Sequence, residues 1–441
     1  MAKDTKIIQG NSILENSPPK GPGREGLYLE GTFKNQSRGF YLSRENLSKH
    51  LLLLGSTGSG KTNVFYRLLA QIKKNLARED LLVIFDSKGD YLWKFYQPGD
   101  QIISNFRDLR GKSLKWNIYK EILVDGWEDD QVYTNAYEIS HSLFQEALET
   151  SGQKFFPNAA KDLFTAIMVA QIRLGKDDLD FRKKYFNNQA LRYFLDSLSE
   201  EKLKNLLDPG VFPDLSSVLM YLGDFSNSQA LGVIAEVQAM SHQVLIGEFA
   251  KNGRFSARDF VRNEGGKTLF IDYDLGMGES LGPIYRLLID LSLKEALSRK
   301  KSGGNIYFVF DEFKLLPRLK HIDDGLNFGR SLGVKIIAGL QTIDQIYSVY
   351  GKNRGVNLMA GFSNIISFKL NDFTSKDYIS NLYGKNLVLD QYKTSTGLVL
   401  EDKREGRTVE SWDLTDLLPG EAIVGLSDSR PFSFKFSLYK D

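Results

Sequence analysis

The chain has 441 residues, enough for about two or three domains, and its 42% hydrophobic and 25% charged residues are typical of a globular protein. Cysteine is absent, which excludes disulfide bridges and thiolate metal sites, and the four histidines are scattered along the chain. Any metal is therefore expected to have oxygen ligands, which favours Mg²⁺. The net charge of +2 neither indicates nor excludes a nucleic-acid partner.

No targeting or membrane segment is predicted. The first residues lack an apolar segment behind a basic one, and no stretch approaches the roughly 18 continuous apolar residues that cross a bilayer. The longest apolar candidate, residues 164–175, is too short and contains Arg173. We expect a soluble chain.

The N-terminal third shows the start of an α/β sheet. Residues 1–45 are expected to form a β-rich segment, with short strands in LYLEGTF and GFYLS. Residues 46–125 contain an apolar run at 49–54, a glycine loop, helical periodicity over 62–77 and a second apolar run at 81–85. Strand, loop, helix and strand in this order predict parallel strands.

The middle of the chain is predicted to be an all-α insertion, residues 126–255. Segments 147–174, 187–207 and 229–249 have helical patterns, without strand alternation between them. The α/β pattern resumes over 256–441, where apolar runs at 268–273, 306–311, 334–340 and 364–370 predict a parallel sheet covered on both faces. Charged, alternating residues after about 385 predict a hairpin at the sheet edge.

Residues 55–62, GSTGSGKT, match the phosphate-loop pattern G-x-x-x-x-G-K-[ST] between a strand and a helix. Backbone N–H groups of such a loop face phosphate oxygens, Lys61 reaches the β- and γ-phosphates, and Thr62 offers its hydroxyl to Mg²⁺. ATP and Mg²⁺ are the expected ligands; a plain glycine-rich turn is the alternative. The predicted nucleotide-binding residues are Gly55, Ser56, Thr57, Gly58, Ser59, Gly60, Lys61 and Thr62.

A carboxylate pair, Asp311 and Glu312, follows the apolar run that ends at Phe310. Charges at the end of a buried strand are costly unless something compensates them. With a phosphate loop in the same chain, we expect Asp311 to hold Mg²⁺ through water and Glu312 to act as the base for the attacking water. The alternative is that both cap the following helix.

Two further polar residues are candidates for catalysis. Gln341 follows the apolar run 334–340 and is expected beside the ligand crevice, where it would sense the γ-phosphate or place the water. Arg330 is a candidate for stabilising transition-state charge in a neighbouring subunit. An ordinary loop glutamine and a surface ion pair are the respective alternatives.

A second motif, FDSKGDYLW at residues 85–93, places Asp86 at the end of an apolar run. From the residues alone, Lys88 and Asp90 are interpreted as part of a solvated loop.

These motifs, together with FVFDEFKLLPRL, LNFGRSLGVKIIAGLQTIDQIYSVYG and AGFSNIISFKLND, resemble in content and order the VirD4/TraG/TraD-type coupling ATPases of type IV secretion and conjugation. The resemblance covers about residues 45–120 and 260–385, and extends more diffusely over the helical segment. It implies a RecA-like P-loop NTPase domain of the FtsK/HerA superfamily with an inserted all-α domain. It also implies a ring hexamer on DNA, with ATP between subunits.

The resemblance also implies residue roles. It matches Lys61 and Thr62 to the family's phosphate-loop residues and Asp311 and Glu312 to its metal and water carboxylates. Gln341 matches the family's polar residue after the next strand. Arg330 matches its proposed arginine finger.

The resemblance implies a motor that hydrolyses ATP and drives DNA or a relaxase–DNA complex to a type IV secretion channel. Expected partners are DNA, relaxase or relaxosome proteins, channel components and further copies of the chain. The family's usual membrane helices are not found, so we expect a cytoplasmic location or attachment to the inner face of the membrane through a partner. The alternatives are an adaptor that recruits cargo with little translocation, and a soluble FtsK/HerA-like translocase. The candidate DNA contacts are Lys314, Arg318, Lys320 and His321. The alternative is that these residues form an ordinary solvated surface.

Overall fold

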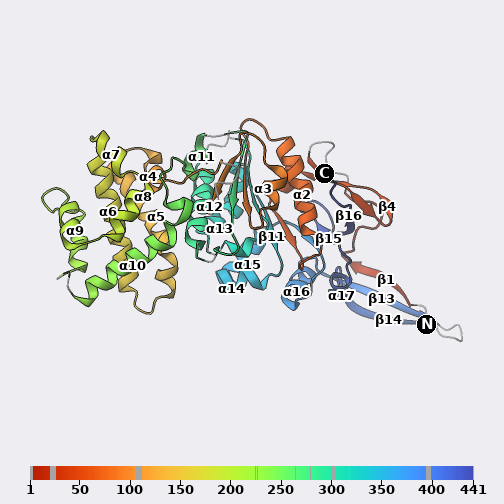
Figure 1. Cartoon of the computed structure of the whole chain (residues 1–441). Coiled ribbons are helices and arrows are strands. Elements are labelled where there is room, and N and C mark those ends of the chain that lie inside the picture. Colours follow the sequence, from red (N-terminus) through yellow and green to blue (C-terminus); the bar gives the residue numbers. More distant parts are fainter. Residues whose placement is uncertain are drawn as a thin grey trace. The chain divides into compact units, whose positions relative to one another are not determined.

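The structure, a computed structural model, describes residues 3–19, 26–105, 112–223, 225, 227–263, 265–278, 280–299, 304–316, 318–393 and 399–440. The chain forms two compact units. Unit 1 contains Met1–Ile84 and Lys300–Asp441, and unit 2 contains Phe85–Arg299. Figure 1 shows the helices and strands of both units.

Unit 1 is built on a large sheet, whose strands follow the order β4-β3-β16-β15-β12-β6-β11-β10 and then β7. Its strands are β3 (Gly31–Phe33), β4 (Gln36–Ser37), β6 (Leu51–Leu54), β7 (Leu81–Asp86, which continues into unit 2), β10 (Ile306–Phe310), β11 (Val334–Leu340), β12 (Asn364–Ser367), β15 (Glu421–Gly425) and β16 (Phe432–Phe436). Strands β12, β6, β11 and β10 are parallel, which confirms the predicted parallel core. All residues of β6 and β11 are buried, as expected for strands covered on both faces.

The other part of this sheet is antiparallel, which the sequence analysis did not predict. Strand β15 pairs antiparallel with β12, β16 with β15, β3 with β16, and β4 with β3. Strand β16 alternates buried and exposed residues, the pattern of a strand with one covered face. The short strands β2 (Gly26–Leu29) and β5 (Phe40–Ser43) form a separate antiparallel pair.

The C-terminal hairpin exists, but its predicted place at the edge of the large sheet is wrong. Strand β13 (Lys385–Lys393) pairs with β14 (Val399–Arg407) and with β1 (Lys3–Gly10), so that these strands form their own antiparallel sheet (Figure 1). The last strand of the large sheet on that side is β4. Strand β13 is the middle strand of this sheet, with β1 on one side and β14 on the other.

The helices of unit 1 include α2, which directly follows the phosphate loop. Its buried residues are Val64, Phe65, Leu68, Leu69, Ile72 and Lys73, and the apolar ones among them give the helical periodicity seen in the sequence. The helices are α1 (Arg44–Ser48), α2 (Lys61–Lys74), α13 (Ile322–Phe328), α14 (Asp344–Tyr350), α15 (Lys352–Ala360), α16 (Phe373–Leu382) and α17 (Ser411–Thr415), with 3₁₀ turns η5 (Phe313–Leu315) and η6 (Gly329–Leu332).

Unit 2 contains the end of β7, then β9 (Lys267–Asp272) and β8 (Gln101–Ser104), with β8 parallel to β9. Most of the unit is helical (Figure 1). Its helices are α3 (Asp90–Phe95), α4 (Ile118–Ile122), α5 (Asp129–Thr150), α6 (Phe155–Gly175), α7 (Leu179–Tyr185), α8 (Asn188–Asp196), α9 (Glu200–Leu206), α10 (Ser228–Val244), α11 (Ala257–Asn263) and α12 (Gly282–Leu297), with 3₁₀ turns η2 (Leu123–Asp125), η3 (Ser216–Tyr221) and η4 (Gly247–Ala250).

All three segments predicted as helices are divided. Segment 229–249 breaks after α10, where Ile246 is extended before η4. Segment 147–174 breaks between α5 and α6, where Ser151 is extended and Gly152 follows. Segment 187–207 breaks before α9, because Ser199 is extended and its hydroxyl accepts the N–H of Lys202 as an N-cap. Helix α6 packs against α5 and α10. The domain limits at 126 and 255 stay a prediction.

None of the helices in the described ranges combines the length and the apolar character needed to cross a bilayer.

Candidate nucleotide site at the phosphate loop

Three neighbouring parallel strands of unit 1 end at the same edge of the sheet. Strand β11 lies between β6 and β10, with Leu340 opposite Leu54 and Phe310 opposite Ala338. The segments that follow them begin with Gly55, Gln341 and Asp311, so the phosphate loop, the glutamine and the acid pair share one edge. Ligands of open α/β sheets bind at this carboxyl edge. Two strand spacings, about 10 Å, separate the phosphate-loop strand from the acid-pair strand.

The backbone of the phosphate loop requires glycine. Gly58 and Gly60 have φ values of +75° and +115°, in the left-handed region that other residues rarely adopt. A Cβ on Gly60 would lie 3.1 Å from the backbone of Gly420, and one on Gly55 would lie 2.6 Å from the Cβ of Phe368. The glycines therefore permit both the curl of the loop and its close contact with the surrounding strands.

Three segments hold the loop in place. The N–H of Gly55 donates to Leu340 O at 3.0 Å, and that of Ser56 to Lys369 O at 2.9 Å. The N–H of Gly420, just before β15, donates to Ser59 O at 2.8 Å. The antiparallel extension thus supports the nucleotide loop, and sequence reasoning missed this role of Lys369 and Gly420.

The loop and the start of α2 fit a phosphate. Helix α2 has 14 residues and begins at Lys61, and its N-cap, Gly60, makes no side-chain capping bond. The first-turn N–H groups of a helix have no partner within the helix and favour an anion. Lys61 Nζ donates to Gly55 O and Ser56 O, so the ammonium spans the loop. The Ser59 hydroxyl is buried and has no hydrogen-bond partner in the described part of the chain.

A series of side-chain hydrogen bonds joins the phosphate loop to the acid pair. Thr57 Oγ1 donates to Gln341 Oε1 at 3.4 Å, and Gln341 Nε2 donates to Glu312 Oε2 at 3.0 Å. The structure therefore brings together three residues that lie far apart in the sequence. The other carboxylate oxygen, Glu312 Oε1, has no hydrogen-bond partner among the described residues, although Lys314 Nζ lies 4.0 Å away.

The capping alternative for Glu312 is wrong. Glu312 precedes only the three-residue turn η5, and its side chain makes no capping bond there.

Asp311 is 5% exposed, at the end of β10. Within the described ranges, no three or more His, Asp or Glu side chains gather to hold a metal. A cation at this edge would take most of its ligands from phosphate and water, as Mg²⁺ commonly does. That Thr62 and Asp311 hold it stays a prediction.

Arg330 lies in η6 and makes the surface ion pair that the sequence analysis left as its alternative. Its side chain is 56% exposed, and its guanidinium lies 3.3 Å from Glu45, which is also exposed. The pKa of Glu45 is lowered, chiefly by its hydrogen bond and charge interaction with Lys49 and to a lesser degree by Arg330. A role toward a neighbouring copy stays a prediction.

The basic residues after the acid pair occupy different environments. Lys314 lies beside Glu312, and Arg318 has a left-handed φ of +60°. His321 Nδ1 lies 4.0 Å from Asp324. Their predicted contacts with DNA are not tested by these positions.

The motif FDSKGDYLW lies in unit 2 at the carboxyl end of β7. Asp86 is fully buried and accepts the N–H groups of Gly89 at 2.9 Å and Leu92 at 2.8 Å. Burial raises the pKa of Asp86 to about 6, against the effect of these bonds. Lys88 and Asp90 are exposed, as the solvated-loop interpretation predicted. Asp86 thus closes the turn, a role that its position did not reveal.

Comparison with known proteins supports a specific family. Residues 39–412 match the family described as "Type IV secretion-system coupling protein DNA-binding domain". The coupling protein TraD of Escherichia coli (strain K12) is 22% identical over 330 residues, which cover 71% of this chain and 41% of TraD. The conjugal transfer protein TraG of Agrobacterium fabrum is 26% identical over 288 residues, 63% of this chain and 42% of TraG. The chain thus spans less than half the length of these relatives.

Solved structures show the same fold. The plasmid coupling protein TrwB in complex with ADP and Mg²⁺ has a TM-score of 0.73 at 20% identity, covering 98% of this chain and 94% of TrwB. VirB4 of Thermoanaerobacter pseudethanolicus has a TM-score of 0.56 at 14% identity, covering 96% of this chain and 99% of VirB4. With the family match extending over most of its length, this chain belongs to the type IV secretion-system coupling protein family.

Proposed function

We propose that this chain is an ATP-hydrolysing motor of the coupling-protein type, which drives DNA or nucleoprotein toward a type IV secretion channel. The main support for hydrolysis is the series of hydrogen bonds from Thr57 through Gln341 to Glu312. It connects a phosphate-binding loop to a carboxylate whose second oxygen has no hydrogen-bond partner among the described residues. A phosphate loop next to a base that can activate water is the arrangement expected for hydrolysis.

Each side chain has a distinct role in this proposal. Lys61 exchanges its contacts with Gly55 O and Ser56 O for the β- and γ-phosphates of ATP. Glu312 Oε1 accepts the proton of the attacking water, while Gln341 holds Glu312 in position through Oε2. Thr62 and Asp311 would hold Mg²⁺, which when bound neutralises charge on the phosphate oxygens.

We further propose that the working form is a ring, a homo-hexamer, with Arg330 reaching the nucleotide of the next copy. The guanidinium is exposed and pairs with an exposed glutamate, Glu45. An exposed ion pair of this kind is weak, so exchanging it for a phosphate contact costs little free energy. Arginine supplied from a neighbour stabilises transition-state charge in other P-loop enzymes.

The proposed substrate is DNA, single- or double-stranded, and the proposed partners are relaxase or relaxosome proteins and channel components. The family description names a DNA-binding domain, and the matched relatives are coupling and conjugal transfer proteins. Structures of TrwB contain ADP with Mg²⁺, which supports the proposed ligands. Lys314, Arg318, Lys320 and His321 are the proposed DNA contacts. We place the chain in the cytoplasm, or at the inner face of the membrane through a partner.

ATP hydrolysis measured with and without DNA tests this function. We expect DNA to stimulate hydrolysis, and Lys61→Ala and Glu312→Gln to abolish turnover. Glu312→Gln should still bind ATP, because the amide keeps the shape of the side chain but not its basicity. Glu405→Gln, at an exposed glutamate that pairs with Lys385 on the hairpin, is the matched control and should behave like the wild type. If DNA does not change the rate of ATP hydrolysis at any salt concentration while the chain still binds a cargo protein, the alternative of a cargo-recruiting adaptor is favoured.

A further inference from the structure

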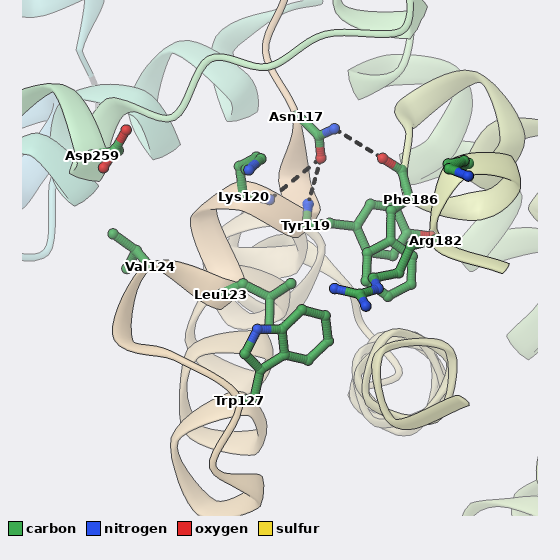
Figure 2. A pocket seen from close by; sticks show the side chains of 10 residues that line it. Asn117, Tyr119, Lys120, Leu123, Val124, Trp127, Arg182, Phe186 and Asp259 are labelled. Carbon is green, nitrogen blue, oxygen red and sulfur yellow. Dashed lines mark hydrogen bonds between the residues drawn. The ribbon is translucent and has the colours of Figure 1, made fainter. Parts of the chain in front are cut away.

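A cavity in the helical part of unit 2 is lined by aromatic and basic side chains that have no part in the proposed ATP hydrolysis. Its volume is about 450 Å³, and it lies among α4, η2, α7 and α11. Figure 2 shows its lining: Trp127, Arg182, Phe186 and Tyr119 lie close together, whereas Asp259 lies apart from them.

Aromatic rings form one wall of the cavity. Tyr119 and Phe186 stack with their planes 6° apart and their centroids separated by 4.7 Å. Trp127 stacks on Phe186 at 6.1 Å and 23°, and the Arg182 guanidinium lies 5.2 Å from the centre of the Trp127 ring. We call Tyr119, Phe186, Trp127 and Arg182 the stacking wall. Tyr119 is buried and supports Phe186 from within the wall, whereas Phe186, Trp127 and Arg182 are partly exposed. A partly exposed ring beside a guanidinium is suited to another flat aromatic group.

The protein holds this wall in a defined position. Asn117 Oδ1 accepts the N–H of Tyr119 at 2.9 Å, and its Nδ2 donates to Phe186 O at 3.0 Å (Figure 2). The Tyr119 hydroxyl donates to buried Gln171 at 2.5 Å, and burial raises the pKa of Tyr119, which keeps it neutral. A Cβ at Gly175 would lie 2.4 Å from Phe186, so the absence of a side chain there makes room for the ring. A wall built in advance lowers the entropy cost of binding.

The charge of the cavity is mainly positive. Lys120, Arg182 and Lys183 contribute cations and Asp259 a carboxylate. Lys183 is paired with Asp180 at 3.1 Å. In the described part of the chain, Arg182 Nε is buried without a hydrogen-bond partner, which is an unmet donor beside the aromatic rings. The positive charge of the Arg182 guanidinium would attract an anion carried by a flat aromatic ligand.

We propose that this cavity binds a nucleotide unit, with its base against the stacking wall and its phosphate toward Arg182 and Lys120. Stacked aromatic side chains next to cations are how proteins bind single-stranded nucleic acids without reading sequence. The same chemistry is offered by a free mononucleotide and by one nucleotide of a DNA strand. This site is separate from ATP hydrolysis at the phosphate loop, and a Lys61→Ala background removes that loop as a second binder.

Fluorescence of Trp127 tests the proposal directly. In a chain carrying Lys61→Ala, the exposed Trp93 and Trp412 are replaced by Phe, which leaves Trp127 and the buried Trp116 as emitters. Thymidine monophosphate, an oligothymidylate and a glutamate-rich peptide are titrated separately. We expect both nucleotide probes to quench Trp127. Lys120→Gln and Arg182→Gln should each weaken binding about tenfold, within the range known for such contacts.

The matched control is Lys202→Gln, which removes a cation 5.8 Å from the exposed ring of Tyr193, elsewhere in unit 2, and should leave quenching unchanged. Lys120 is exposed, so its variant stays informative if Arg182→Gln loses structure by circular dichroism. Binding of the oligonucleotide far tighter than the monophosphate, and weakened by salt, identifies a strand as the ligand. Equal binding identifies a free nucleotide. Quenching by the peptide alone, or by no probe, overturns the proposal.

Discussion

Replacement of Gln341 by alanine tests whether its hydrogen bond to Glu312 positions that carboxylate for hydrolysis. The change removes the donor that holds Glu312 Oε2 at 3.0 Å and the acceptor of Thr57 Oγ1. A hydrogen bond to a charged group contributes about 1.5–3 kcal/mol. Since about 1.36 kcal/mol corresponds to a tenfold rate change, kcat should fall by about 10- to 150-fold. KM for ATP should change little, because the phosphate loop itself is intact.

Steady-state ATP hydrolysis in the presence of DNA, with nucleotide affinity measured separately, is the assay for Gln341→Ala. The matched control is Gln391→Ala, which removes a similar glutamine–glutamate bond of 2.7 Å to Glu401 on the exposed hairpin and should leave kcat unchanged. A fall in kcat of less than about threefold, or a higher KM with unchanged kcat, would refute the positioning role, because such a change removes binding and not catalysis.

Three further predictions concern the ion pair, a buried histidine and the phosphate loop. Arg330→Ala should lower DNA-stimulated hydrolysis at least about 100-fold if Arg330 acts on a neighbouring copy. Glu45→Gln, which removes the ion pairs of Glu45 with Arg330 and with Lys49, should preserve the rate. Equal, small effects in both variants would contradict the trans role. Burial lowers the pKa of His50 from 6.5 to about 4, so as pH falls below 6.5 the unfolded chain takes up a proton that the folded chain does not. Urea unfolding of unit 1 should therefore show a loss of about 2 kcal/mol between pH 7.5 and pH 5, less in His50→Asn, and an equal loss in both would exclude His50 as the cause. Gly60 has a φ of +115°, and a Cβ there would lie 3.1 Å from Gly420. Gly60→Ala should therefore lower nucleotide affinity, measured by calorimetry, while the chain stays folded. Unchanged affinity would show that the loop tolerates a side chain.

The parallel core was predictable because its strands are apolar runs that end at a glycine or a polar residue, such as Gly55, Asp311 and Gln341. Residues 51–54 and 334–340 are buried on both faces. Their short length and the flanking Gly55 and Gly333 distinguish them from buried helices. Strand β16 was missed although its alternation, FSFKF, was present as a signal. Strand β8 was also missed, although Ile102 and Ile103 in it are buried.

The candidate site was predictable as a set of residues, but not as a geometry. The order of strands places Gln341 between Thr57 and Glu312, yet their hydrogen bonds depend on side-chain conformations that no spacing specifies. The support of the loop by Gly420 joins residues 361 positions apart, from Ser59 to Gly420, and only folding reveals it. The stacking wall was missed for the same reason, since Trp127 and Phe186 come from segments with no shared motif.

Turnover of ATP by Glu312→Gln in the presence of DNA, with the mass of the assembly recorded alongside, tests the central claim most directly. We predict that this variant binds ATP and assembles on DNA as the wild type does, but hydrolyses ATP at least about 100-fold more slowly, as expected for loss of a general base. Wild-type turnover by Glu312→Gln, or a wild-type rate that DNA does not change, would contradict the claim that the residues at this sheet edge form the ATP-hydrolysing site of a DNA motor.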